Sequence, residues 1–215
     1  PGFTGSGGVL TDERANAPFR LPVQWVNRPN LDFRGFSGTV TSGSIKPGDS
    51  VVVAKSGKSS RVKAIVTADG DQPRAAAGDA VTLVIEDEID ASRGDVFAAT
   101  EARPEVSNLF TANILWMTED ELPPGHAYLL KIGAQTVQAT VTGIRHKIDI
   151  NTLDKAQGHA LGLNEIGFCN LSTNQPIAFD PYRNIREGGA FILIDRFPHQ
   201  TAGAGMIEFS LIRAT

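Results

Sequence analysis

The short run Gly57-Lys58-Ser59 contains the residue types that end a phosphate-binding loop. In such a loop, glycines and a helix N-terminus present backbone N–H groups to the phosphates while the lysine supplies positive charge. The loop also requires a glycine five positions before Gly57, where this chain has Val52. The run lies between two predicted strands and no helix follows it. We therefore interpret it as a hairpin turn and expect no nucleotide site here.

Two further segments match fragments of guanine-nucleotide motifs. Asp32-Phe33-Arg34-Gly35 fits the bare Asp-x-x-Gly pattern that GTPases place near magnesium. Asn151-Thr152-Leu153-Asp154 misses the guanine-reading Asn-Lys-x-Asp by its lysine. A pattern with two fixed positions arises often by chance, and the first copy lies inside a predicted barrel. Neither segment predicts a site.

The remaining candidates for chemistry are scattered. His126, His146, His159 and His199 are far apart, and none has the close spacing to a second ligand that marks a zinc site. The lone Cys169 excludes an internal disulfide, and its apolar neighbours predict a buried core thiol. The sequence therefore predicts no catalytic, cofactor-binding or metal-binding residue.

Charge limits the classes of partner. The net charge is −4 and the pI about 5.6, which disfavours a general nucleic-acid or anionic-membrane binder. Lys55, Lys58, Arg61 and Lys63 form a local basic group, either a solvated hairpin or a phosphate-contacting patch. No apolar run approaches the roughly 20 residues of a membrane span, and no signal-peptide pattern opens the chain. We expect a cytoplasmic protein without a membrane or nucleic-acid partner.

The elements that would position these residues are short strands. Phe19 to Val26 alternates apolar and polar residues, as a half-buried strand does. Lys46-Pro47-Gly48-Asp49 is a turn. In Arg61–Val66, we expect Val62, Ala64 and Val66 to share one face. The further predicted strands of this half are Thr39–Ile45, Val51–Ala54, Val81–Ile85 and Asp95–Ala99.

The pattern restarts after Glu101–Pro104. In Val137–Thr142, apolar and polar residues alternate strictly, which indicates a strand in a sheet with one face exposed to water. Asn151–Leu163 is the one segment that suggests a helical turn. The other predicted strands are Asn108–Trp116, Phe191–Ile194 and Ile207–Leu211. We predict an all-β protein of two tandem antiparallel Greek-key-type barrels, at 18–101 and 102–215, after a linker or expression remnant at 1–17.

Several longer segments resemble a known family. The chain is similar to the second and third domains of the large GTPase subunit of bacterial sulfate adenylyltransferase (ATP sulfurylase), in the elongation-factor-Tu-like superfamily. The form fused to adenylylsulfate kinase is an equal match. The resemblance covers Pro18 onward, and its segments are Pro22–Val40, Leu115–Gly133, His146–Lys155, Leu161–Leu171 and Phe191–Ile207.

The resemblance implies a function in sulfate assimilation. In that family a separate small subunit transfers the adenylyl group of ATP to sulfate, which gives adenosine 5′-phosphosulfate and pyrophosphate. GTP hydrolysis on the large subunit is coupled to this reaction. GTP and magnesium are then expected on a GTPase domain that precedes residue 18, so this chain alone is expected to hold no cofactor and to be inactive. The implied partners are the catalytic adenylyltransferase subunit, the chain's own GTPase domain and, in the fused form, the kinase domain.

Two questions stay open at this stage. A mixture of aromatic, arginine and short polar residues suggests a partner interface, although Trp25 also fits the barrel core and the others fit caps of turns around Pro29. The translation factors that share this barrel pair also suggest an RNA- or tRNA-binding module as an alternative function. The candidate interface residues are Trp25, Asn27, Arg28, Asn30, Asp32 and Arg34.

Overall fold

The computed structural model describes residues 14–28, 33–123, 125–149, 152, 154–158, 160–197 and 199–212. The chain divides into two compact units, 1–103 and 104–215. We call them barrel 1 and barrel 2. The elements of barrel 1 are β1 (Arg20–Pro22), β2 (Trp25–Asn27), β3 (Gly35–Thr39), β4 (Ser44–Ile45), β5 (Ser50–Val53), β6 (Ser59–Thr67), β7 (Gly70–Asp71), β8 (Ala75–Ala76), β9 (Ala80–Ile85), β10 (Val96–Ala99) and the 3₁₀ turn Thr100–Ala102.

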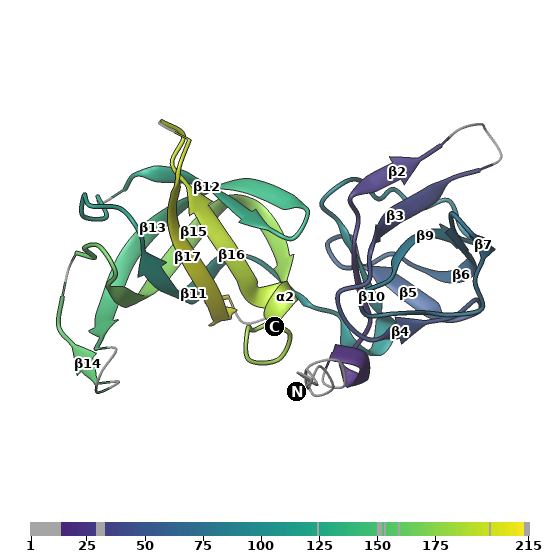
Figure 1. Cartoon of the computed structure of the whole chain (residues 1–215), viewed down its shortest axis with the longest axis horizontal. Coiled ribbons are helices and arrows are strands. Elements are labelled where there is room, and N and C mark those ends of the chain that lie inside the picture. The colour runs from purple at the N-terminus through teal and green to yellow at the C-terminus, as the bar shows by residue number, and fades with distance from the viewer. Residues whose placement is uncertain are drawn as a thin grey trace, which may run out of the picture. The chain divides into compact units, whose positions relative to one another are not determined.

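Barrel 1 is closed by one bent stretch of chain. Its strands follow the order β1-β10-β5-β6-β9-β3-β2, and all the pairs are antiparallel. β1 and β2 stand at the two ends of this order but are separated by only Val23 and Gln24 in sequence. The chain therefore passes from one edge of the sheet to the other and closes the barrel (Figure 1).

The core of barrel 1 consists of inward-facing residues from these strands. Leu21, Phe36, Ile65, Leu83 and Phe97 are all fully buried. The rings of Phe36 and Phe97 are 5.0 Å apart in a tilted arrangement, which aromatic pairs prefer over a face-to-face sandwich. Burial of these side chains holds the sheet closed and fixes which residues face outward.

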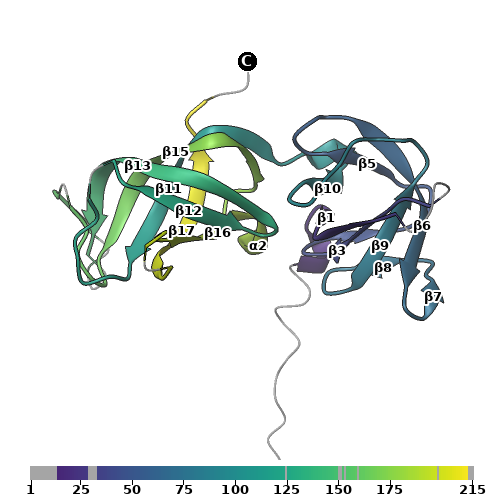
Figure 2. The same cartoon turned by 90° about the horizontal axis from the view of Figure 1, so that it is seen from above.

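Barrel 2 contains the longer strands of the molecule. Its ring order is β12-β16-β17-β11-β15-β13, and the additional β12–β13 pairing closes it. Figure 2 shows β11, β13 and β15 side by side. The elements are β11 (Glu105–Trp116), β12 (Ala127–Ile132), β13 (Gln135–Ile148), β14 (Lys155–Ala156), β15 (Ile166–Phe179), α2 (Arg186–Gly189), β16 (Ala190–Ile194) and β17 (Thr201–Ser210).

The core of barrel 2 is also rich in aromatic residues. Phe110 contacts Phe179 and Phe191, with ring centroids 5.5 and 6.3 Å apart. The Trp116 ring meets Tyr128 edge-on at 5.7 Å. The two tandem antiparallel barrels confirm the predicted fold class.

Some predicted strand bounds are wrong. The predicted strand Thr39–Ile45 is two elements, because the strand β3 ends at Thr39 and Gly43 adopts a left-handed φ of 69° before β4. The segment Asn151–Leu163 contains no helix among its described residues, which include β14 instead. The short helix of barrel 2 is α2, where no helix was predicted.

A β-bulge changes which face the residues of β6 occupy. The pairing with β9 shifts between Val62 and Ala64, so two residues of β6 occupy one position of the ladder. Val62 is buried as expected, but Ile65 is the next buried residue, while Ala64 and Val66 are half-buried. The prediction that Val62, Ala64 and Val66 share a face is therefore wrong, since alternation resumes with the opposite phase after a bulge.

The described end of the expected linker is attached to barrel 1. Residues 14–16 form a helical turn. The backbone carbonyl of Arg14 accepts a hydrogen bond of 2.7 Å from the N–H of Gly43, and the Ser42 hydroxyl donates to the Pro18 carbonyl at 2.6 Å. From residue 14 onward, the segment is therefore part of the barrel's end.

Candidate functional site

The outer surface of barrel 1 has a row of aligned side chains around Trp25. Trp25 lies opposite Ser37, Ser37 opposite Thr82, and Thr82 opposite Val66, so the row crosses β2, β3, β9 and β6. The hydroxyls of Ser37 and Thr82 are hydrogen-bonded at 2.7 Å, which satisfies two polar groups within the row. Half-buried Val84 lies in the next row. We call this surface the Trp25 face.

Trp25 itself projects into solvent. Its relative exposure is 63%, so the interpretation of Trp25 as a core residue is wrong. The reason is the break between β1 and β2: Phe19, Leu21 and Val23 point inward, but the chain then changes strands and the alternation does not continue. Val26 packs against the core in place of Trp25. An exposed Trp beside small side chains is a typical anchor for a protein partner.

The two described arginines of the candidate interface differ in their surroundings. Arg28 is half-exposed and lies 3.7 Å from Glu88. The Arg34 guanidinium lies over the Phe36 ring at 5.3 Å, within 3.9 Å of Asp90, and donates weakly to the Ala91 carbonyl at 3.5 Å. Arg34 is thus tied to the end of the barrel, whereas Arg28 is presented at the surface. Asn27 ends β2 and is half-buried, and Asn30 and Asp32 lie outside the described residues.

Carboxylates predominate beside these arginines. The loop after β9 contains Glu86, Asp87, Glu88 and Asp90. Asp87 accepts a hydrogen bond of 2.8 Å from the Ser60 hydroxyl, and its own N–H donates back to that oxygen at 3.0 Å. These bonds fix the loop against β6, so its other carboxylates are held next to the Trp25 face. A surface of this charge repels phosphate groups.

The basic hairpin is formed by β5 and β6, and the backbone carbonyl of Arg61 accepts a hydrogen bond of 2.9 Å from the N–H of Glu86. Gly57-Lys58-Ser59 connects β5 to β6, as the sequence predicts, and Gly57 has a φ of 71°. Lys55 lies 3.8 Å from Asp95, which leaves Lys58, Arg61 and Lys63 as its exposed bases. The Arg103 side chain fills the space beside Gly57 and donates to the carbonyl of Ala54 at 2.7 Å.

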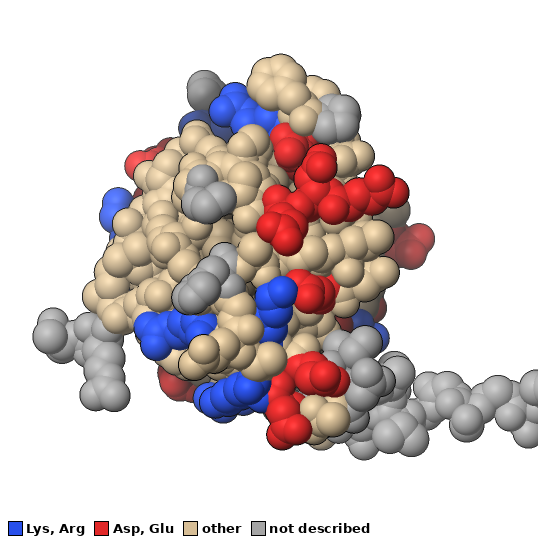
Figure 3. Space-filling model, turned by 90° about the vertical axis from the view of Figure 1, so that its left-hand side faces the viewer, with Lys and Arg blue, Asp and Glu red and all other residues tan. Residues whose placement is uncertain are grey.

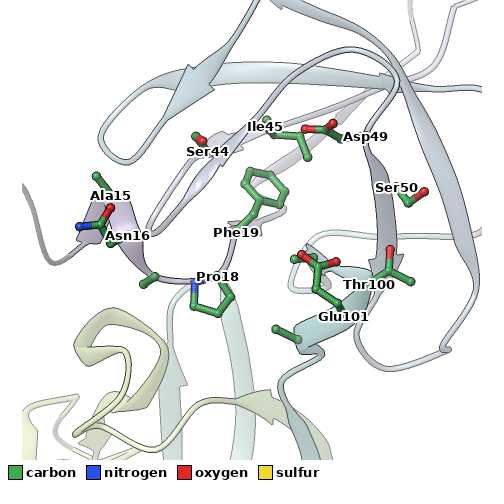
Figure 4. A pocket seen from close by; sticks show the side chains of 13 residues that line it. Ala15, Asn16, Pro18, Phe19, Ser44, Ile45, Asp49, Ser50, Thr100 and Glu101 are labelled. Atoms are coloured by element: carbon green, nitrogen blue, oxygen red, sulfur yellow. The ribbon is translucent and has the colours of Figure 1, made fainter.

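A shallow hollow of about 880 Å³ opens at the end of barrel 1 (Figure 4). Phe19 and Ile45 contribute apolar surface, and Asp49 and Glu101 contribute carboxylates. Asp49 accepts a hydrogen bond of 3.0 Å from the N–H of Lys46 and thereby closes the turn around Pro47. The lining residues include no Lys or Arg, and one of the two carboxylates is used in a turn. The lining therefore does not offer the positive charge that would bind the phosphates of a nucleotide.

A second hollow, of about 530 Å³, lies on the outside of barrel 2. It is formed mainly by apolar residues of β11, β16 and β17, including Leu115, Ile192 and Met206, with Lys131 and Tyr182 at its border. Gly205 in its lining packs tightly on the inner side, where a Cβ would collide with the ring of the buried Phe191.

The loop end of barrel 2 contains the most exposed aromatic residue of the described chain. Phe197 lies at the tip of the β16–β17 hairpin with 86% of its surface exposed. Sequence reasoning missed it, because a single Phe between charged residues and Pro has no periodicity. The available signal was an aromatic side chain placed in a polar turn between two predicted strands.

The described residues show neither a metal-ligand cluster nor a membrane-spanning helix. Across the part of the chain that the structure describes, no three His, Cys, Asp or Glu side chains are grouped as metal ligands. The same residues include no helix with the length and apolar character needed to cross a membrane.

Family models match both barrels. Residues 36–98 match the model of elongation factor Tu domain 2, and residues 109–208 match the model described as GTP-eEF1A C-terminal domain-like. The fold also resembles that of the crystal structure of sup35 complexed with GDP, with a TM-score of 0.82 and 23% identity over 94% of this chain and 49% of that one.

Curated relatives are much more similar in sequence. The bifunctional enzyme NodQ of Rhizobium sp. (strain N33) is 56% identical over 92% of this chain and 30% of its own length. Sulfate adenylyltransferase subunit 1 of Chromobacterium violaceum is 56% identical over 88% of this chain and 40% of its own length. The chain thus spans less than half of these relatives. It belongs to the elongation-factor-Tu-like GTPase superfamily, as the pair of β-barrel domains found in sulfate adenylyltransferase subunit 1 and NodQ.

Proposed function

We propose that this chain is the non-catalytic barrel portion of a sulfate-activating GTPase subunit, and that barrel 1 docks the catalytic adenylyltransferase subunit through the Trp25 face. The partner would join ATP and sulfate to give adenosine 5′-phosphosulfate and pyrophosphate, with GTP hydrolysis coupled to product formation. Support comes from relatives named sulfate adenylyltransferase subunit 1 and from the exposed Trp25.

The surroundings of Trp25 favour a protein partner. The indole stands beside Ser37, Thr82 and half-buried Val66, which form a surface of low relief from which it projects. Small neighbours leave the apolar faces of the ring free to enter a pocket, and removal of a buried interface Trp typically costs about 2 kcal/mol or more. Arg28 and Asn27 would add polar contacts at the border, while Arg34 would act through its position at the barrel end.

The charge beside this face disfavours the RNA-binding alternative. Glu88 lies beside Arg28 and Asp90 beside Arg34, so each of these guanidiniums already faces a carboxylate. An RNA-binding face would instead need an excess of Lys and Arg and would bind with steep salt dependence.

The barrels would also transmit the state of the GTPase domain. In this role they move as rigid bodies when the nucleotide domain switches, and they carry the partner with them. GTP and magnesium would bind that domain and not the barrels. In a kinase-fused parent, which the similarity to a bifunctional enzyme allows, the barrels would also connect to the kinase domain.

The test is calorimetric titration of this chain with the catalytic adenylyltransferase subunit from the same organism. We expect Trp25→Ala to weaken binding at least about tenfold, equivalent to about 1.4 kcal/mol. Ile212→Ala is the matched control, since Ile212 is a large apolar residue of barrel 2 with a similar exposure of 51%. Equal affinity of Trp25→Ala and the unmodified chain would exclude the Trp25 face as the contact.

A further inference from the structure

The loop end of barrel 2 collects exposed apolar groups from three separate segments. Met117 follows β11, Leu163 precedes β15, and Phe197 lies between β16 and β17. Met117 and Leu163 are each about half exposed, and Phe197 is almost fully exposed. Exposed apolar side chains are common singly, but three at one end of a barrel indicate an interaction surface.

Backbone hydrogen bonds bring these segments together. The N–H of Met117 donates to the carbonyl of Ala202 at 2.9 Å, which connects the first loop to the start of β17. The N–H of Asn164 donates to the carbonyl of Trp116 at 2.9 Å, which connects the Leu163 loop to the end of β11. The surface is therefore built on paired strands.

The backbone of Phe197 is held by its own turn. The Asp195 carboxylate accepts a hydrogen bond of 3.0 Å from the N–H of Phe197, and the N–H of Asp195 donates to the carbonyl of Gln200 at 2.8 Å. Asp195 is in turn 3.5 Å from His126, a residue next to β12. A fixed backbone at the tip lowers the conformational entropy that is lost when the tip binds a partner.

Three consecutive carboxylates border this surface. Glu119, Asp120 and Glu121 are exposed, and Trp116 holds their loop through its indole N–H, which donates to the carbonyl of Asp120 at 2.7 Å. Figure 3 shows acidic side chains gathered beside an uncharged area on this side of barrel 2. A complementary partner would present Lys or Arg to these carboxylates and an apolar pocket to Phe197, whose neighbour Arg196 is also exposed.

We propose that this end of barrel 2 is a second protein-docking surface, with Phe197 as the anchor that enters an apolar pocket bordered by basic residues. The inference rests on the proposed function, because the partner to which it commits is the same adenylyltransferase subunit. Two contacts on one chain raise the effective concentration at the second contact, so each can be weak while the whole binds well.

The test adds two variants to the calorimetric titration. Phe197→Ala is expected to weaken binding at least tenfold. The double variant Glu119→Gln with Glu121→Gln is expected to weaken it about threefold and to flatten its dependence on salt, because it removes charge but little shape. Ile212→Ala again serves as the control. It lies beyond the opposite end of β17, about 30 Å from the tip at 3.3 Å per strand residue.

Each outcome decides a different claim. If the unmodified chain binds and Phe197→Ala binds equally well, this second surface is excluded while the proposed function stands. If Phe197→Ala alone loses affinity, barrel 2 is the docking unit. If the unmodified chain gives no heat of binding, the proposed function falls and this inference falls with it. Thermal melting should give the same midpoint for Phe197→Ala and the unmodified chain, since the side chain packs against little of the fold.

Discussion

At the scale of single residues, the thiol of Cys169 is the clearest case of burial controlling chemistry. It lies fully inside barrel 2, and desolvation raises its pKa to about 12. Because the thiolate is the reactive form, we expect a chromogenic disulfide reagent at pH 8 to leave the folded protein unmodified. After unfolding in guanidinium chloride, one thiol per chain should react. Rapid reaction of the native protein would contradict the buried position.

The pKa of Glu165 is shifted in the opposite direction, downward. Its Oε2 accepts a hydrogen bond of 2.7 Å from the N–H of Gly162 and one of 2.6 Å from Lys147 Nζ, and these contacts lower its pKa, although burial opposes them. A lowered pKa in the folded state means that the stabilisation is complete above the unfolded-state value and disappears as pH falls through the folded-state value.

We therefore predict that Glu165→Gln destabilises the protein by about 1 kcal/mol at pH 7, because a partly exposed charge-assisted pair contributes modestly. Near pH 3 the difference from the unmodified chain should shrink, because the stabilisation by the ionised carboxylate decreases once the pH falls below the unfolded-state pKa and towards the lowered folded-state pKa. Urea unfolding at the two pH values measures this. If the two proteins differ in free energy of unfolding by the same amount at pH 7 and near pH 3, the charge of Glu165 does not contribute to stability.

At the scale of elements, the close approach of β3 to the β1–β2 segment requires a glycine. A Cβ on Gly38 would stand 2.2 Å from the carbonyl oxygen of Pro22, a backbone atom that cannot rotate away. We expect Gly38→Ala to destabilise barrel 1 by about 2–3 kcal/mol, seen as a lower denaturation midpoint. Gly143→Ala is the control, because a Cβ there meets nothing within 4 Å. Equal stability of the two variants would contradict the described packing.

The sequence predicts strands well where one face is strictly apolar and less well where the ladder is irregular. Val137–Thr142 was recognised, but it is part of the much longer β13, whose pairing with β15 shifts twice. The sequence does not predict β15, because its inward positions include the small or polar Gly167, Cys169 and Thr173. Bulges, chain bends and small inward residues depend on neighbouring strands, so a single segment does not reveal them.

The candidate site was predictable only in part, for the same reason. Composition alone pointed to Trp25 and Arg28, but it did not reveal that the break after Val23 turns Trp25 outward. Nor did it show that Arg34 lies over the Phe36 ring. Phe197 was missed because a one-residue anchor in a turn depends on the hairpin that presents it.

At the scale of the whole molecule, we predict that this chain alone neither binds GTP nor forms adenosine 5′-phosphosulfate. Gly57-Lys58-Ser59 lies in a hairpin between β5 and β6, so it lacks the helix N-terminus that a phosphate loop provides. Titration with a fluorescent GTP analogue should give no saturable signal. Lys58→Ala is the informative control, because a signal abolished by that change would place a nucleotide at the hairpin and contradict the prediction.

The measurement that tests the central claim most directly is calorimetric titration of the unmodified chain into the catalytic adenylyltransferase subunit from the same organism. The account predicts saturable binding with a Kd in the micromolar range or tighter, as expected for a standard protein interface with an aromatic anchor. Absence of binding heat at several temperatures would contradict it, and would leave the barrels without a docking function of their own.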